Sequence, residues 1–186
     1  MWTAQTYLGM VVRDARYYMY LLVEDYVDAQ KLFHEAVVEN LRLLGFRTGT
    51  KSAIFAPDAV AKEHIKMELH GVFSEAMIRK LWGKTPGILF TDRNLSEVDP
   101  IHNRWLFLSL RPYMEERSPS ALTTLFSDLE RMIVGSADVI SLLGNRRVSL
   151  LEWLREKVMI EPNFYGIGLK PMNRTALRDV IVTNRV

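Results

Sequence analysis

Acidic side chains follow three apolar stretches of this sequence, at the points where buried strands are expected to end. These acids are Glu24, Asp25, Asp58 and Asp92. In a mostly parallel sheet the carboxyl ends of the strands meet at one edge, where α/β proteins bind their ligands. Neighbouring carboxylates at such an edge can bind Mg²⁺ or divide the roles of general acid and general base. This chemistry would make the chain a metal-dependent hydrolase or phosphoesterase, although the same residue types serve more often as helix caps.

A second candidate site is the polar connection between the strands expected at residues 87–91 and 104–111. It contains Asp99, His102 and Arg104. The connection is long for a hairpin, and long loops on a rigid scaffold often carry binding functions. A histidine beside an aspartate can also act as a general base. Because the spacing specifies no serine, cysteine or lysine partner, a merely solvated loop is the favoured interpretation, and a binding loop is the functional alternative.

The C-terminal residues 145–186 form a third candidate surface, in which cations and aromatic side chains occur together. The residues of interest are Arg146, Arg147, Trp153 and Tyr165. This stretch holds eight basic and four acidic residues, whereas the preceding 144 residues hold 16 basic and 18 acidic ones. Basic residues interleaved with aromatics are typical of nucleic-acid binding. Trp153 falls on the apolar side of its expected helix, so packing against the core competes with that function.

Several kinds of chemistry are excluded by composition. The chain has no cysteine, which rules out disulfides, thiolate nucleophiles and thiolate metal ligands. The stretch 45–52 resembles a phosphate-binding loop, but Thr50 stands where the motif requires a glycine before Lys51. No complete set of metal ligands is recognisable either. We therefore predict no cofactor and no bound metal.

The order of expected elements is strand, helix, strand, helix, strand, strand, helix, which indicates an α/β fold. Their ranges are 16–25, 28–44, 50–56, 59–82, 87–91, 104–111 and 118–143. Gly45 is the expected terminator of the first helix. In the extension we expect a helix over 148–158, a strand over 164–169 and a last helix from Asn173 through Ile181.

The Thr85-Pro86 step directly before the strand Gly87–Thr91 resembles the thioredoxin-like fold, whose C-terminal half is laid out in this way. The resemblance covers roughly residues 16–143 and implies that Pro86 is a packing residue with a cis peptide bond. In that family a Cys-x-x-Cys motif sits where the first strand meets the first helix. The matching stretch, 24–29, has neither cysteine nor serine, so the resemblance implies a scaffold without redox activity. A flavodoxin-like doubly wound sheet is the alternative fold.

Length and charge bound the organisation and the partners. A chain of 186 residues suits one α/β core domain over 1–144 with an extension over 145–186 packed on it. The net charge of +2 does not by itself favour a polyanionic partner. No signal sequence or membrane-spanning run is recognisable, so we expect a cytosolic location and no membrane partner. The leading hypothesis is a non-catalytic binding module whose partner is another protein, with nucleic-acid binding or homo-oligomerisation as further alternatives.

Overall fold

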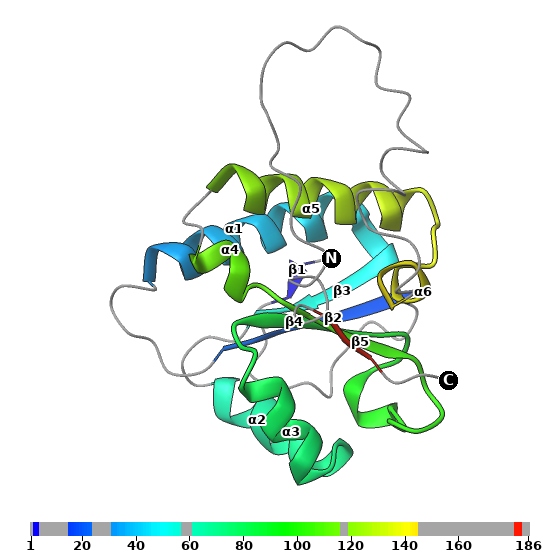
Figure 1. Ribbon diagram of the computed structural model, residues 1–186. Coiled ribbons are helices and arrows are strands. Elements are labelled where there is room, and N and C mark those ends of the chain that lie inside the picture. The colour runs from blue at the N-terminus through cyan, green and yellow to red at the C-terminus, as the bar shows by residue number, and fades with distance from the viewer. Residues whose placement is uncertain are drawn as a thin grey trace, which may run out of the picture.

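The structure is a computed structural model that describes residues 2–3, 15–23, 31–56, 61–115, 119–144 and 181–183. It is a mixed α/β fold with one sheet between two layers of helices (Figure 1). The helices are α1 (Lys31–Thr48), α2 (Ala61–Val72), α3 (Glu75–Trp82), α4 (Arg111–Glu115), α5 (Pro119–Val134) and α6 (Val139–Gly144). The 3₁₀ turns are η2 (Gly49–Lys51) and η3 (Leu95–Glu97).

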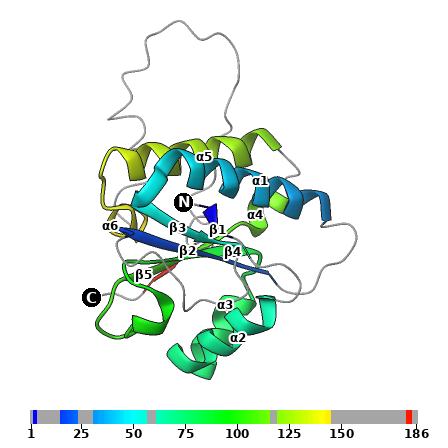
Figure 2. The same ribbon diagram turned by 180° about the vertical axis from the view of Figure 1, so that it is seen from behind.

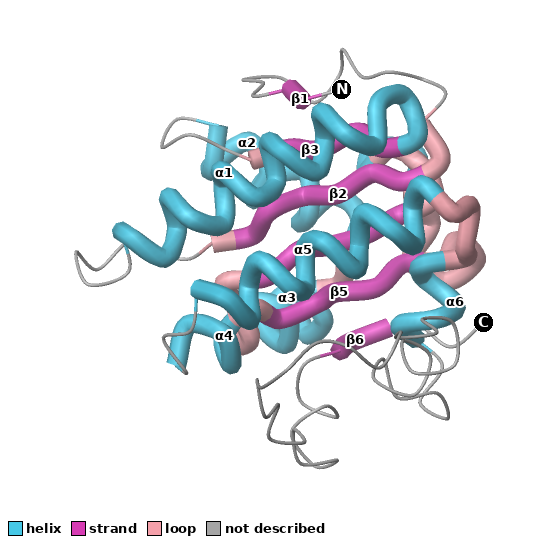
Figure 3. The backbone as a smooth tube through the Cα atoms, turned by 90° about the horizontal axis from the view of Figure 1, so that it is seen from above, coloured by secondary structure: helices cyan, strands magenta, loops and turns pink. Residues whose placement is uncertain are grey.

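The sheet has six strands in the order β1-β3-β2-β4-β5-β6. They are β1 (Trp2–Thr3), β2 (Tyr17–Leu22), β3 (Ser52–Phe55), β4 (Gly87–Thr91), β5 (Trp105–Ser109) and β6 (Ile181–Thr183). The connection through α1 makes β2 and β3 parallel, as a crossover helix requires. In contrast, β4 runs antiparallel to both β2 and β5. Figure 3 shows the short strands β1 and β6 at the two edges of the sheet.

Both faces of the sheet are covered, which explains why all six residues of β2 are buried. Alternate side chains along a strand point to opposite faces. Tyr17, Met19 and Leu21 therefore join the core beneath α1 and α5, whereas Tyr18, Tyr20 and Leu22 join the core against α2 and α3. Figure 2 shows the same two helical layers from behind.

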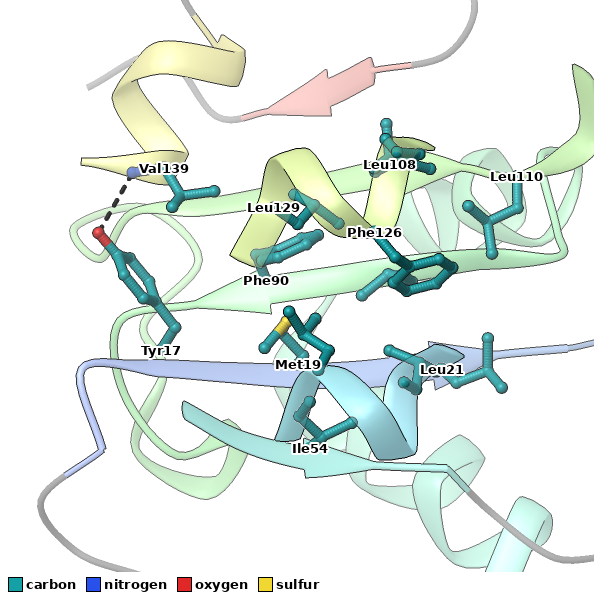
Figure 4. Close-up of a cluster of buried hydrophobic side chains, with 14 of the residues drawn as sticks. Tyr17, Met19, Leu21, Ile54, Phe90, Leu108, Leu110, Phe126, Leu129 and Val139 are labelled. Atoms are coloured by element: carbon teal, nitrogen blue, oxygen red, sulfur yellow. Dashed lines mark hydrogen bonds between the residues drawn. The ribbon is translucent and has the colours of Figure 1, made fainter. Parts of the chain in front are cut away.

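The two cores differ in the kind of side chain that fills them. The core beneath α1 and α5 is mainly aliphatic, with Phe90 and Phe126 among leucines and a methionine (Figure 4). The core against α2 and α3 is built on aromatic pairs. Tyr20 stacks on Phe55 with ring centroids 4.7 Å apart, and Phe73 meets Trp105 edge to face at 5.1 Å.

The first helix is longer than its sequence predicts. Gly45 does not end it: this glycine is buried inside α1, which continues to Thr48, because tertiary packing overrides a local stop signal. The helix ends instead beside Gly49, whose φ of 58° lies in the left-handed region that favours glycine. Leu32, in the first turn of α1, is 79% exposed.

Two expected long helices are each divided in the structure. The helix predicted over 59–82 is broken before Ser74, which starts α3 by accepting a hydrogen bond from the Met77 amide at 3.4 Å. The helix predicted over 118–143 is broken between α5 and α6, where Ser136 has a φ of 59°. In both cases the apolar pattern of the sequence continues across the break. The break itself is set by a capping residue in the first case and by a turn residue in the second.

The end of the chain contributes a strand. Ile181 was expected to end a helix but begins β6, which pairs antiparallel with β5. Three consecutive β-branched residues, Ile181, Val182 and Thr183, suit a strand better than a helix. The helix expected over 148–158 and the strand expected over 164–169 lie outside the described residues. In the described part of the chain, no helix combines the length and the apolar content that crossing a bilayer requires.

The start of β4 depends on a glycine, and this gives a stability test. A Cβ atom added to Gly87 would lie 2.2 Å from Cζ of Phe107 and 2.8 Å from the carbonyl oxygen of Leu108. We expect Gly87→Ala to lower the free energy of unfolding by about 2–3 kcal/mol, because the buried β5 strand must shift. Urea denaturation followed by circular dichroism measures this loss.

Gly71→Ala is the matched control, because a Cβ atom at Gly71 in α2 meets nothing within 4 Å. Its effect on the free energy of unfolding should stay within about 1 kcal/mol and be neutral or stabilising. Equal effects of the two substitutions would contradict the close approach of β4 and β5 at Gly87.

Candidate functional site

Several residues nominated from the sequence lie outside the described part of the chain. They are Glu24, Asp25, Asp58, Arg146, Arg147, Trp153 and Tyr165. The described candidates are Pro86, Asp92, Asp99, His102 and Arg104. Pro86 lies at one end of the sheet. The other four lie at the opposite end, near the connection between β4 and β5.

Asp92 does not lie at the carboxyl edge of β2 and β3, where the sequence analysis expected it. The register pairs Tyr18 of β2 with Thr91 of β4, and Leu22 with Gly87. Because β4 is antiparallel to β2, Asp92 emerges where β2 begins, at the opposite end of the sheet. The expected gathering of four acids at one edge is therefore wrong for Asp92.

Pro86 lies at the end of the sheet away from Asp92, beside the carboxyl end of β2. Its peptide bond with Thr85 is cis. The carbonyl oxygen of Pro86 accepts a hydrogen bond from the Leu110 amide at 2.7 Å, which continues the pairing of β4 with β5. The Thr85 hydroxyl donates to the carbonyl oxygen of Trp82 at 2.8 Å and so ties the end of α3 to the start of β4. These hydrogen bonds of Thr85 and Pro86 join the start of β4 to α3 and to the end of β5.

The loop between β4 and β5 is organised around the carboxylate of Asp99. One of its oxygens accepts hydrogen bonds from the amides of Ile101 at 2.8 Å and His102 at 3.3 Å. Its other oxygen lies 2.6 Å from Nδ1 of the His102 ring, which donates to it. Asn103 closes the turn, because its side-chain oxygen accepts from the Asp99 amide at 2.7 Å. Five consecutive residues thus form a hydrogen-bonded turn typical of an aspartate at a turn start.

This ordered turn holds an apolar side chain out in solvent. Ile101 is 75% exposed, and the His102 side chain beside it is 78% exposed. The other side of the turn is fixed to the protein, since Nε1 of the buried Trp105 donates to the carbonyl oxygen of Pro100 at 3.1 Å. Figure 1 shows the loop at the end of the sheet opposite α4. An exposed isoleucine on a fixed turn is suited to contact another molecule.

Arg104 joins the end of this loop to the turn before α6. Its Nε lies 3.5 Å from Oδ2 of Asp92, and its Nη1 donates to Oδ2 of Asp138. Asp138 also caps α6, because its carboxylate accepts from the Ser141 amide at 3.1 Å and from the Ser141 hydroxyl at 2.9 Å. The Arg104 guanidinium therefore connects three segments: the one that follows β4, the one that precedes β5 and the one that precedes α6.

The charges in this network stabilise one another. Partial burial alone would raise the pKa of Asp138, but hydrogen bonds from Ser141 and Arg104 outweigh it and hold that pKa below its usual range. The hydrogen bond to Asp138 likewise raises the pKa of Arg104. Oδ1 of Asp92 is buried and has no hydrogen-bond partner among the described residues, so Arg104 is the cation that balances this carboxylate.

Two tyrosine hydroxyls at the central strand fix the same region. The Tyr17 hydroxyl donates to the carbonyl oxygen of Ala137 at 2.7 Å and accepts from the Val139 amide at 3.2 Å, as Figure 4 shows for Val139. The Tyr20 hydroxyl donates to the Asn94 side chain at 3.2 Å and accepts from the Leu95 amide at 2.9 Å. Burial raises the pKa of Tyr20 well above its ordinary value, so its hydroxyl keeps its proton.

Sequence analysis found the loop but missed most of what organises it. Asp138 lies more than thirty residues from Arg104 in sequence, and no local pattern links the two. Asn103 and Ile101 carried a local signal, because Asp99-Pro100 followed by Asn103 is a turn composition. Within the described residues, no group of three or more histidine or acidic side chains has the geometry to hold a metal ion.

Comparison with known proteins gives no relative: no protein-family model, no curated protein and no solved structure matches this chain.

The Asp99 turn gives a prediction about titration. Hydrogen bonds from the His102 ring and the Ile101 amide hold the pKa of Asp99 below its ordinary value of 3.8. A carboxyl whose pKa is lowered by folding stabilises the fold at pH values above its ordinary pKa. This stabilisation is lost as the pH falls through the lowered pKa. We expect the NMR titration of the Asp99 carboxyl to show this lowered pKa, and His102→Ala to raise it. An Asp99 pKa that His102→Ala leaves unchanged would contradict the hydrogen bond.

The Arg104 network gives a prediction about stability. Arg104→Ala leaves the partly buried Asp92 carboxylate without a cation, so we expect the free energy of unfolding to fall by about 1–2 kcal/mol. Arg104→Lys should lose less, because it keeps the charge but not the planar fork that reaches two carboxylates. Urea denaturation at neutral pH measures both.

Lys66→Ala is the control for Arg104, because Lys66 makes an exposed ion pair with Glu63 at 3.8 Å. Removing such a pair should change the free energy of unfolding by less than about 0.5 kcal/mol. If Arg104→Ala costs no more than Lys66→Ala, the network does not hold α6 to the sheet.

Proposed function

We propose that this chain is a non-catalytic interaction module that binds another protein through the loop between β4 and β5, on a thioredoxin-like scaffold without redox activity. The observation that carries the function is the ordered turn around Asp99, which presents Ile101 at 75% exposure. No thiol chemistry is open to it, since the chain has no cysteine.

The scaffold proposal is supported by the pairing of the strands. A parallel β2–β3 pair joined by α1 and an antiparallel β4–β5 pair follow the element order that the resemblance implies. A flavodoxin-like sheet is mostly parallel, and the antiparallel pairing of β4 with both of its neighbours argues against that alternative.

The binding proposal is supported by the rigidity of the loop. A loop that must become ordered on binding loses conformational entropy at that moment, whereas a preorganised loop does not. Here Asp99 orders the turn, and the Tyr20 hydroxyl and Trp105 indole fix its two flanks. The apolar Ile101 can then insert into a pocket of a partner, which is how a few anchor residues supply most of the affinity of an interface.

The competing functions have less support among the described residues. A metal-dependent hydrolase at the carboxyl edge of the sheet loses Asp92, which lies at the opposite end. The nucleic-acid alternative rests on Arg146, Arg147 and Trp153, which lie outside the described residues. A protein partner at the loop is therefore the function that the geometry favours.

The experiment is a pull-down in which the full chain and its variants are immobilised and retained proteins are identified by mass spectrometry. We expect Ile101→Asp to reduce the retained partner at least tenfold, since it places a charge at the centre of the apolar contact. Asp99→Ala should also reduce it, because the turn loses its order while Ile101 remains.

Met67→Asp is the matched control, because Met67 is a similarly exposed apolar residue, at 62%, on α2. It should retain the partner at the level of the unsubstituted chain. Binding through this loop would be refuted if the Ile101→Asp variant still retained the partner. It would also be refuted if the Met67→Asp variant lost the partner to the same extent as Ile101→Asp. Circular dichroism of each variant confirms that the fold is kept.

A further inference from the structure

The solvent side of α1 carries large apolar side chains. Leu32 is 79% exposed, Leu43 42% and Phe46 83%. The opposite side of the same helix is used by the core, where Val37, Leu41 and Leu44 are buried. Helix α1 therefore has a second apolar side that the described fold leaves in solvent.

These three side chains form one line along the helix. Leu43 and Phe46 follow Leu32 by 11 and 14 residues, so at about 100° per residue both fall within about 40° of its direction. Glu39 falls on the same line, midway between Leu32 and Phe46, and its side chain is 58% exposed. It pairs with Arg42, one turn further along, at 3.7 Å. Leu32 is therefore the apolar residue at one end of this line and Phe46 the apolar residue at the other. The ion pair of Glu39 with Arg42 lies between them.

We propose that this side of α1 is an interface with a second copy of the chain, in which the two α1 helices run antiparallel about a two-fold axis beside Glu39. Leu32 and Phe46 are each seven residues from Glu39. The two-fold axis therefore places each Leu32 against the partner's Phe46, which buries the most exposed side chain at each end. A two-fold interface must be self-complementary in this way.

The charges on this side also fit a second copy. Under the same axis Arg42 lies opposite the partner's Ala36 and beside the partner's Glu35, which is exposed. Each Glu39 faces its symmetry mate, but each already has Arg42 as a cation 3.7 Å away. A membrane surface is a poor occupant, since an interfacial helix places Lys and Arg around its apolar face, whereas Glu35 and Glu39 lie within this one.

This interface is separate from the proposed binding loop. Helix α1 covers the face of the sheet that bears the aliphatic core, whereas Leu95 of the loop belongs to the aromatic core on the other face. Substitutions on α1 and on the loop can thus be tested independently. Failure of one proposal leaves the other standing.

The absence of cysteine from the chain allows a direct test. We expect Glu39→Cys to form a disulfide-linked dimer under mild oxidation, because helices packed about 8–10 Å apart bring residues at the two-fold axis within disulfide distance. Lys80→Cys, exposed on α3, is the control and should form no such dimer. Equal cross-linking of both variants, or none at Glu39→Cys, would overturn the proposed geometry.

Sedimentation equilibrium tests the interface without cross-linking. We expect the full chain to show a monomer–dimer equilibrium, and Phe46→Asp to raise its dissociation constant at least tenfold, whereas Met67→Asp should leave it unchanged. Glu35→Arg and Arg42→Glu should each weaken the dimer, and the double variant should regain affinity because the exchanged charges meet again across the axis. A chain that stays monomeric up to about 100 μM would overturn the proposal, as would retention of the dimer by Phe46→Asp.

Discussion

The antiparallel pairing of β4 with β2 is the constraint on which the rest of the structure depends. It decides which residues meet at each end of the sheet, because it places Gly87 beside Leu22 and Thr91 beside Tyr18. Pro86 is thereby fixed beside the carboxyl end of β2, and the loop that follows β4 is fixed beside its beginning. A parallel β4 would have exchanged these two positions. Strand direction thus decides which end of β2 the loop meets, and it places Asp92 away from the carboxyl edge of β2 and β3.

The central strand also explains why the loop is rigid. Tyr17 and Tyr20 lie on opposite faces of β2, so their hydroxyls reach different segments: the turn before α6 and the start of η3. A buried tyrosine hydroxyl needs a hydrogen-bond partner, and each of these has two, so the segments cannot move without leaving buried polar groups unpaired. Arg104 also links the loop directly to the turn before α6, through Asp92 and Asp138. The order of the loop therefore originates in the core of the sheet.

Local patterns in the sequence predicted what local physics decides. The bounds of β4 at Gly87–Thr91 are as expected, since a short apolar run between a proline and an acid has few other interpretations. The direction of β4 against β2 is a long-range property that no local pattern specifies, and the hypothesis of acids gathered at one sheet edge depended on it. Gly45 and Ser74 show the same limit in the helices, because burial continues α1 through a glycine and a capping serine divides an apolar pattern. In the candidate site, loop length and the types of Asp99, His102 and Arg104 identify the segment that we propose as the binding loop, but no local signal links Asp138 to it.

The two proposed surfaces have different energetic roles. A loop that offers one apolar anchor buries little area, and small interfaces are typically weak and transient. Pairing of α1 with a second copy would join two such loops in one particle. Once one loop has bound a partner that is itself repeated, the second binds at a high effective concentration, and the overall affinity rises without any new contact at the loop. Because the loop and α1 lie on opposite faces of the sheet, a two-fold pairing through α1 leaves both turns around Asp99 in solvent. In the proposed arrangement the rigid turn would determine which partner is bound, and the helix pair would determine how strongly.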